Sequence, residues 1–206
     1  MSHPDLLPRD ETGDPSITTI QFESLSAGVG RGQSMLCVAP TSTGKTLVGV
    51  WGTLTWLQGG PGRRAVYLVT HKALARQKFE EMQRLVGDYL FDGDLACIVL
   101  ANGDIVQDGT GAVPTTPLDA PLLIATYEKY LAMLAGSGVR GDMTDHAVVC
   151  DEIQILGDET RGRAIEVLLT LTKSHSGLSA LKLGLDVQLL RRIDGFPTNR
   201  AIGEAN

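Results

Sequence analysis

The sequence has no hydrophobic run long enough to cross a membrane, few cysteines, and no surplus of positive charge. Residues 1–16 also lack the basic and apolar regions of a secretory signal. The three cysteines, Cys37, Cys97 and Cys150, are odd in number and lie far apart in apolar runs, which favours buried thiols over a disulfide framework or a metal site. Together these absences predict a cytoplasmic protein with no membrane partner.

The charge balance limits how the chain could meet nucleic acid. Its 18 lysines and arginines against 24 aspartates and glutamates give a formal net charge of −6. Such a chain cannot coat nucleic acid through its overall charge, although a local basic stripe could still hold a strand. A hydrophobic fraction of 43% and a charged fraction of 20% exclude wholesale disorder and suit a globular domain.

Two regions differ in composition. Residues 1–16 carry three prolines and four acids against one base, which predicts a flexible acidic arm with no core to bury. Residues 17–206 alternate short apolar runs with polar or helical segments, and we expect them to form one domain.

The alternation of apolar runs and helices predicts the fold. Runs of strand length lie at 34–38, 65–70, 96–100, 122–126, 147–150 and 181–185. Helical patterns fill 46–57 and 71–86, with Gly87 suited to a helix end, and the composition of 102–119 predicts a loop. Continuous apolar strands separated by helices are typical of a parallel sheet covered on both faces. The sequence therefore predicts a three-layer, doubly wound, mostly parallel α/β domain.

The strongest motif is APTSTGKT, which spans 39–46 between an expected strand and an expected helix. It matches the phosphate-loop pattern of glycine, four residues, then Gly-Lys-[Ser/Thr], except that Ala39 replaces the first glycine. Backbone N–H groups at the helix start can surround a phosphate, Lys45 can contact the β- and γ-phosphates, and the Thr46 hydroxyl can ligate Mg²⁺. The predicted nucleotide contacts are Thr41, Ser42, Thr43, Gly44, Lys45 and Thr46. The alternative, a purely structural turn, does not explain why the motif stands between strand and helix.

A second motif, Asp151-Glu152-Ile153-Gln154, directly follows the apolar run at 147–150. Acids at the carboxyl end of a parallel strand point into the crevice where α/β folds bind ligands. We expect Asp151 to hold Mg²⁺ through water, and Glu152 to orient or deprotonate the attacking water. Alone, such a pair is usually a favourable charge at a helix N-terminus, and it gains specificity from the phosphate loop.

APTSTGKT and DEIQ resemble motifs I and II of the superfamily 2 helicases, the DEAD/DEAH-type ATPases, and are most similar to the Ski-like and DNA-repair branch. The resemblance covers about 18–172 and includes the segment 156–162 after motif II. It implies a RecA-like P-loop domain that binds ATP and Mg²⁺ and contacts single-stranded nucleic acid, either DNA or RNA.

Weaker motifs of the family follow in the same order. Gln21 lies where the family has the glutamine that reads adenine, and an amide can pair with the donor and the acceptor of that base. The segment 69–77 resembles motif Ia without its usual proline, Gly103-Asp104 a short family element, and 125–129 motif Ib. The resemblance implies contacts to the sugar-phosphate backbone of one strand from Arg76, Gln77, Thr126 and Lys129, whereas the plain alternative for the basic residues is solvated surface.

The chain departs from the family pattern in three places. Gln154 occupies the position of the histidine that usually couples the ATP site to the rest of the motor. Motif III is either Ser179-Ala180 by residue type or 184–188 by its spacing from motif II. We favour 184–188, because the order of strands in a fold changes less readily than a single residue does. Residues 189–206 are too few for the second RecA-like lobe, so we expect that lobe in trans or lost by truncation.

The expected function is the ATP-binding N-terminal motor lobe of a superfamily 2 helicase, weakly active or inactive alone. The alternative is a catalytically degenerate nucleotide-binding module without motor function. Intact Lys45, Thr46, Asp151 and Glu152 favour the first, whereas the altered motif III and the absent lobe favour the second. A small-molecule phosphotransferase is disfavoured because no acceptor-binding motif is visible.

Overall fold

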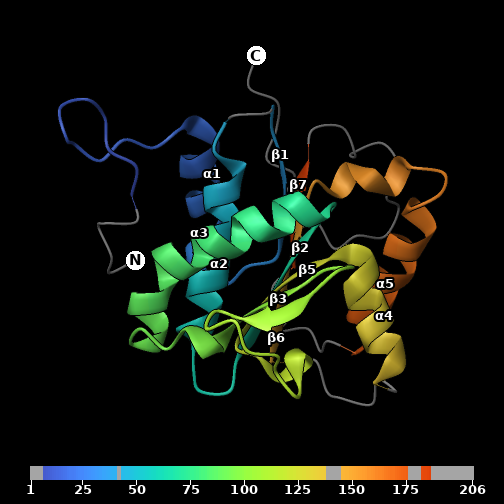
Figure 1. Ribbon diagram of the computed structural model, residues 1–206. Coiled ribbons are helices and arrows are strands. Elements are labelled where there is room, and N and C mark those ends of the chain that lie inside the picture. Colours follow the sequence, from blue (N-terminus) through green and yellow to red (C-terminus); the bar gives the residue numbers. More distant parts are fainter. Residues whose placement is uncertain (1–6, 41–42, 138–144, 176–181, 187–206) are drawn as a thin grey trace.

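The computed structural model describes residues 7–40, 43–137, 145–175 and 182–186, which form a central sheet between two layers of helices (Figure 1). Each strand of the sheet is short, and most are followed by a helix. In chain order the elements are α1 (Thr19–Ala27), η2 (Val29–Arg31), β1 (Met35–Val38), α2 (Lys45–Leu57), β2 (Arg64–Val69), α3 (Lys72–Phe91), η3 (Leu95–Cys97), β3 (Ile98–Ala101), β4 (Val106–Asp108), η4 (Pro117–Asp119), β5 (Leu122–Thr126), α4 (Tyr127–Gly136), β6 (His146–Asp151), η5 (Ile153–Gly157), α5 (Gly162–His175) and β7 (Lys182–Asp186).

The sheet has seven strands in the order β1-β7-β6-β2-β5-β3-β4. Every neighbouring pair is parallel except β3 and β4. Parallel neighbours require crossover connections, and α2, α3, α4 and α5 lie in those connections. The predicted doubly wound, mostly parallel α/β fold is therefore confirmed, and β7 lies where a strand was expected at 181–185, of which residue 181 is outside the described residues.

Strand β2 shows why the predicted apolar runs lack alternation between polar and apolar residues. Ala65, Tyr67 and Val69 belong to the core cluster that includes residues of α1, α2 and α3. Val66 and Leu68 alternate with them and belong to the second cluster, with residues of α4 and α5. Figure 1 shows these two groups of helices on opposite faces of the sheet. Because both faces are covered, alternation between polar and apolar residues is lost and a continuous apolar run remains.

The predicted end of the long helix at Gly87 is wrong, since α3 continues to Phe91. Gly87 is buried within the helix, where an added Cβ would lie 3.0 Å from Leu95 Cδ2. The glycine therefore allows close packing against Leu95. The helix ends at Asp92, which adopts a left-handed φ of 50° and donates its backbone N–H to the Gly87 carbonyl.

The segment 102–119 is not all loop, because β4 lies within it and pairs antiparallel with β3. The three-residue strand offers Val106 as its one apolar side chain, so no hydrophobic pattern marks it. A turn follows directly, in which Asp108 Oδ1 accepts the N–H groups of Thr110 at 2.9 Å and Ala112 at 3.0 Å. The turn composition concealed the short strand.

The amino-terminal segment is described from residue 7 onward. A short antiparallel bridge joins Arg9 and Pro15. Asp10 Oδ1 accepts the backbone N–H groups of Thr12 and Asp14, and Leu7 packs against the core. The rest of the predicted arm, residues 1–6, lies outside the described residues. Among the helices of the described residues, none has the length and hydrophobicity of a membrane span.

Candidate active site

The two main sequence motifs meet at the carboxyl edge of the sheet. β1 ends at Val38 just before the phosphate loop, and β6 ends at Asp151 of the second motif. Both strands pair in parallel with β7, where Val38 lies opposite Asp186 and Asp151 opposite Leu185. Two strand spacings place the Cα atoms of Val38 and Asp151 roughly 10 Å apart. The start of the loop and the acid therefore lie at the same edge of the sheet, with one strand between them.

The phosphate loop leads directly into α2. Gly44 caps this helix with a left-handed φ of 89°, and an added Cβ would collide with the Gln21 side chain. The left-handed backbone conformation therefore favours glycine at this position. The N-terminus of α2 concentrates unpaired N–H groups and the positive end of the helix dipole, as an anion site requires. Thr41 and Ser42 lie outside the described residues.

Lys45 and Thr46 occupy the first turn of α2, and both side chains are half-buried. Lys45 Nζ donates to the carbonyl oxygens of Ala39 at 2.6 Å and Pro40 at 2.7 Å. Thr43 Oγ1 closes the same loop by donating to the Pro40 carbonyl at 2.8 Å. Neutral carbonyl oxygens thus hold the ammonium group over the loop. Charged phosphate oxygens would be stronger acceptors for the same group.

Gln21 is buried, with 3% of its surface exposed, and it bonds to the main chain through both ends of its amide. Gln21 Oε1 accepts the Thr18 backbone N–H at 3.0 Å, while Gln21 Nε2 donates to the Gly44 carbonyl at 3.2 Å. Thr18 Oγ1 also donates to the Thr43 carbonyl at 2.8 Å. The capping box of α1 therefore fastens the helix to the phosphate loop. The predicted adenine contact requires the Gln21 amide to exchange these partners.

Asp151 is held from three directions. Its side chain is buried, Oδ2 accepts from the Tyr67 hydroxyl at 3.1 Å, and Oδ1 accepts the Glu152 backbone N–H at 3.0 Å. The Tyr127 hydroxyl donates to the backbone carbonyl of Asp151 at 2.8 Å. Burial raises the pKa of Asp151, while the hydrogen bond from Tyr67 and the charge of Lys78 act in the opposite direction. Burial also raises the pKa of Tyr67 well above its usual value, so its hydroxyl remains a donor.

The oxygen atoms at this edge suit Mg²⁺ by their chemistry. Each Asp151 carboxylate oxygen accepts one of these hydrogen bonds and keeps a further lone pair. The Thr46 hydroxyl at the start of α2 adds a second hard oxygen. Mg²⁺ prefers such ligands and usually keeps several waters, so one carboxylate with one hydroxyl fits its normal mode of binding beside a phosphate.

Glu152 leaves the direction of β6 immediately after Asp151. Its φ of 53° and ψ of 45° are left-handed, which is uncommon for a residue other than glycine, and the short helix η5 begins directly after it. The side chain is half-buried, and Gln154 Nε2 donates to Glu152 Oε2. The residue at the usual histidine position therefore bonds to the predicted base itself.

A hollow of about 720 Å³ lies at the same edge of the sheet, beyond β2 and β5. It brings the predicted strand contacts Thr126 and Lys129 together with residues of the motif Ia segment. Arg76 and Gln77 are exposed on α3 and do not line it. The hollow is lined by Thr70, His71, Lys72, Ala73, Gly103, Thr126, Glu128, Lys129, Ala132 and Arg161.

Two lining residues also have structural roles. Thr126 is buried, and its hydroxyl accepts the Lys129 backbone N–H at 3.4 Å as the N-cap of α4. His71 caps α3 in the same way, since its Nδ1 accepts the Leu74 N–H at 3.2 Å. Both helices thus begin at the hollow with their positive ends, which favours a phosphate backbone there.

Arg161 is a residue of this hollow to which the sequence assigned no role. Its Nε donates to Glu128 Oε1 at 2.7 Å, and its Nη2 donates to the Thr70 carbonyl. Arg161 therefore joins the end of β2 to the start of α4. The signal that could have found it is its place in the segment 156–162, about ten residues after Asp151, which resembles the family.

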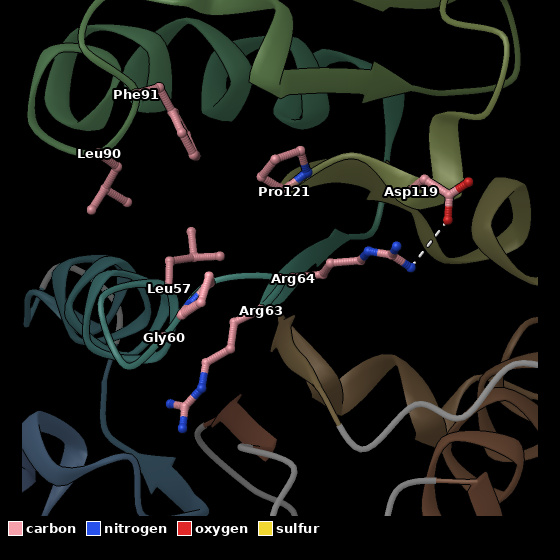
Figure 2. Close-up of a pocket in the computed structure, with 10 residues that line it drawn as sticks. Leu57, Gly60, Arg63, Arg64, Leu90, Phe91, Asp119 and Pro121 are labelled. Carbon is pink, nitrogen blue, oxygen red and sulfur yellow. Dashed lines mark ion pairs between the residues drawn. The ribbon is translucent and has the colours of Figure 1, made fainter.

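A second hollow, of about 330 Å³, lies at the opposite edge, where β2 and β5 begin. Figure 2 shows apolar side chains of Leu57, Leu90, Phe91 and Pro121 on one side, while Arg64 reaches toward Asp119 at 3.1 Å. The neighbouring Arg63 stacks on the ring of Trp56, with 4.5 Å between the guanidinium carbon and the ring centre. Because ligands of parallel α/β sheets bind at the carboxyl edge, this hollow is not part of the candidate site.

Comparison with known proteins identifies the family. A family model described as DEAD/DEAH box helicase matches residues 18–182. An ATP-dependent DNA helicase Hel308 from Pyrococcus horikoshii is 31% identical over 167 residues, covering 78% of this chain and 21% of that protein. A chloroplastic DExH-box ATP-dependent RNA helicase, DExH15, from Arabidopsis thaliana is 30% identical over 139 residues, covering 68% of this chain and 11% of that protein. The chain thus spans about a fifth of the first relative's length and less of the second.

Solved structures share the fold at lower identity. The yeast DEAD-box splicing factor Prp28 superposes with a TM-score of 0.65 and 18% identity, covering 93% of this chain and 47% of that one. The DUF1998 helicase MrfA bound to DNA gives a TM-score of 0.63 and 17% identity, covering 91% and 27%. With the phosphate loop and the Asp-Glu motif at one edge of a doubly wound sheet, and a family model matching most of its length, the chain belongs to the DEAD/DEAH box helicases.

Proposed function

We propose that this chain is the ATP-binding N-terminal motor lobe of a superfamily 2 nucleic-acid helicase. It binds ATP with Mg²⁺ at the carboxyl edge of the sheet, and the reaction is attack of water on the γ-phosphorus. The observation that carries the proposal is the shared edge, where β7 alone separates the strand that enters the phosphate loop from the strand that ends at Asp151. Positioning and electrostatic stabilisation are what such a site supplies to phosphoryl transfer.

Each residue of the site has a distinct role in this proposal. The Lys45 ammonium group moves from the Ala39 and Pro40 carbonyls to the β- and γ-phosphates. The backbone N–H groups that begin α2 also donate to the phosphates. Thr46 and Asp151 hold Mg²⁺, which when bound offsets the negative charge of the phosphates. Glu152 orients the attacking water and accepts its proton.

Single-stranded nucleic acid is the proposed partner at the hollow beyond β2 and β5. Thr126 and Lys129 contact its backbone there, and Arg76 and Gln77 extend the contact along the exposed side of α3. Contacts of this kind position a strand without reading its bases. The matched relatives include proteins named as DNA helicases and as an RNA helicase, so either nucleic acid is compatible.

A nucleotide-binding module without motor function is the second candidate. The observation in its favour is the hydrogen bond from Gln154 to Glu152, because it engages a carboxylate oxygen that the attacking water needs. In that case ATP binds but turnover is absent even when a second RecA-like lobe is supplied. Hydrolysis therefore separates the two candidates, whereas binding does not.

The nucleotide site is tested by calorimetric titration with a non-hydrolysable ATP analogue and Mg²⁺. Lys45→Ala should abolish measurable affinity, because Lys45 is the cation of the phosphate loop. Arg84→Ala is the matched control, since it removes an exposed cation on α3 outside the site. Equal affinity of the Lys45→Ala variant and the wild type would remove the phosphate-loop assignment.

A further inference from the structure

Tyr67 carries a hydroxyl group in the buried part of β2, where its neighbours Ala65, Val66, Leu68 and Val69 are apolar. It lies in β2, where its side chain is fully buried on the face that α2 and α3 cover. A buried tyrosine hydroxyl needs a hydrogen-bond partner, and this one donates to Asp151 Oδ2 at 3.1 Å. The Tyr67 hydroxyl therefore contacts the Asp151 carboxylate directly.

The same phenol touches the helix that follows the phosphate loop. A Cβ added at Gly49 would lie 3.1 Å from both the Tyr67 hydroxyl oxygen and its Cε2, and 3.2 Å from Val149 Cγ1. Gly49 lies one helical turn after Lys45 in α2, so the bare backbone of that turn packs against the phenol. Tyr67 thus stands between the phosphate-loop helix and Asp151.

A second tyrosine provides an internal comparison. Tyr127 approaches Asp151 from the opposite core cluster, is also fully buried, and donates to the backbone carbonyl at 2.8 Å. Both tyrosines therefore bond the same residue and fill similar volumes. They differ in the acceptor, because Tyr127 holds the main chain and Tyr67 holds the carboxylate.

We propose that Tyr67 is a positioning residue that fixes the orientation of the Asp151 carboxylate toward Mg²⁺ and couples it to the phosphate-loop helix. This inference rests on the proposed function and deepens it. Without the hydroxyl, Oδ2 loses its donor, while Oδ1 keeps the Glu152 N–H. Partners that orient a metal ligand are worth about 10- to 100-fold in metal affinity. The loss should appear in Mg²⁺-dependent binding and not in contacts made by the phosphate loop alone.

The experiment measures the affinity of a fluorescent ADP with saturating Mg²⁺ and with EDTA, for the wild type, Tyr67→Phe and Tyr127→Phe. The ratio of the two affinities is the Mg²⁺ enhancement. Tyr67→Phe should lower this enhancement about tenfold and leave the affinity in EDTA unchanged. Tyr127→Phe should keep the enhancement, because the carboxylate retains both of its donors. Thermal melting of each variant reports the structural cost of a lost hydroxyl separately.

The outcomes distinguish this inference from the function on which it rests. A wild type with no Mg²⁺ enhancement would overturn the proposed function. A wild-type enhancement that Tyr67→Phe retains would overturn the role of Tyr67 alone. An equal loss in both variants would also overturn it, since the cause would then be general loosening of the end of β6.

Discussion

Asp151 and Glu152 are neighbours in sequence, but the fold gives their carboxylates different surroundings. Asp151 continues β6, is buried, and accepts hydrogen bonds on both of its oxygens. Glu152 turns into the left-handed region and carries a half-buried side chain that contacts Gln154. A fixed, buried carboxylate suits a metal ligand, whereas a more accessible one suits proton transfer.

This difference predicts that two isosteric substitutions affect different properties, turnover in one case and the Mg²⁺ dependence of binding in the other. Glu152→Gln should leave nucleotide binding nearly intact and depress any turnover, because an amide can hold water but cannot accept its proton. Asp151→Asn should weaken the Mg²⁺ dependence of binding. Both Asp151 oxygens accept hydrogen bonds in the wild type, so the NH₂ group of an asparagine would face either the Tyr67 hydroxyl or the Glu152 N–H, each of which donates to Asp151. Calorimetric titration with and without Mg²⁺, together with steady-state hydrolysis, measures both. If both variants bind with the Mg²⁺ dependence of the wild type, the metal ligand is wrongly placed.

The surface proposed to contact single-stranded nucleic acid is built by several elements more than by single residues. It arises where β2 and β5 end and α3 and α4 begin, and Arg161 connects these ends through Thr70 and Glu128. Lys72 is paired with Asp104, so part of the local positive charge is already compensated. We therefore expect binding that is weak and blind to sequence.

Salt dependence tests this surface. Single-strand binding measured by fluorescence anisotropy should fall steeply with salt, and each lost phosphate contact should reduce the log–log slope by about 0.7. Lys129→Ala should reduce the slope by one such contact, because Lys129 lines the hollow. Arg84→Ala on the outer part of α3 serves as the control. Binding that is insensitive to salt, or that depends on base sequence, would contradict the assignment.

The elements that the sequence predicted well are those whose pattern is set by burial on both sides. The apolar runs of β1, β2, β5 and β6 correspond to strands within a residue or two at each end, because helices cover both faces of the sheet and leave little choice of residue there. The predictions for two elements, the end of α3 and the strand β4, were wrong because a glycine and a turn sequence were interpreted as marking a helix end and a loop. Gly87 serves packing against Leu95 inside α3, and the turn at Asp108 hides the short strand β4.

The site shows the same division between local and long-range information. Lys45, Thr46, Asp151 and Glu152 were predicted from motifs that are continuous in the sequence, and the structure places them at one edge. The hydrogen bonds of Tyr67 to Asp151 and of Arg161 to Glu128 join residues far apart in the chain. No periodicity or motif predicts such pairs, because strand order and helix placement determine them.

At the scale of the whole molecule, the described residues form one RecA-like lobe, and the chain carries a formal net charge of −6. The chain covers 21% of the length of its Pyrococcus horikoshii relative. We propose that a second lobe closes over the γ-phosphate with arginines and moves a second strand-binding surface against this one. An arginine supplied in this way is worth about 10³–10⁵ in rate in related phosphate-loop enzymes.

The most direct test is steady-state ATP hydrolysis and duplex unwinding by the purified 206-residue chain, with the Lys45→Ala variant as the control for contaminating ATPases. The proposal predicts slow hydrolysis that depends on Lys45, no unwinding, and an increase of several orders of magnitude in hydrolysis when the chain is joined to a second RecA-like lobe. Robust unwinding by this chain alone, or hydrolysis that Lys45→Ala retains, would contradict the assignment of a single ATP-binding motor lobe.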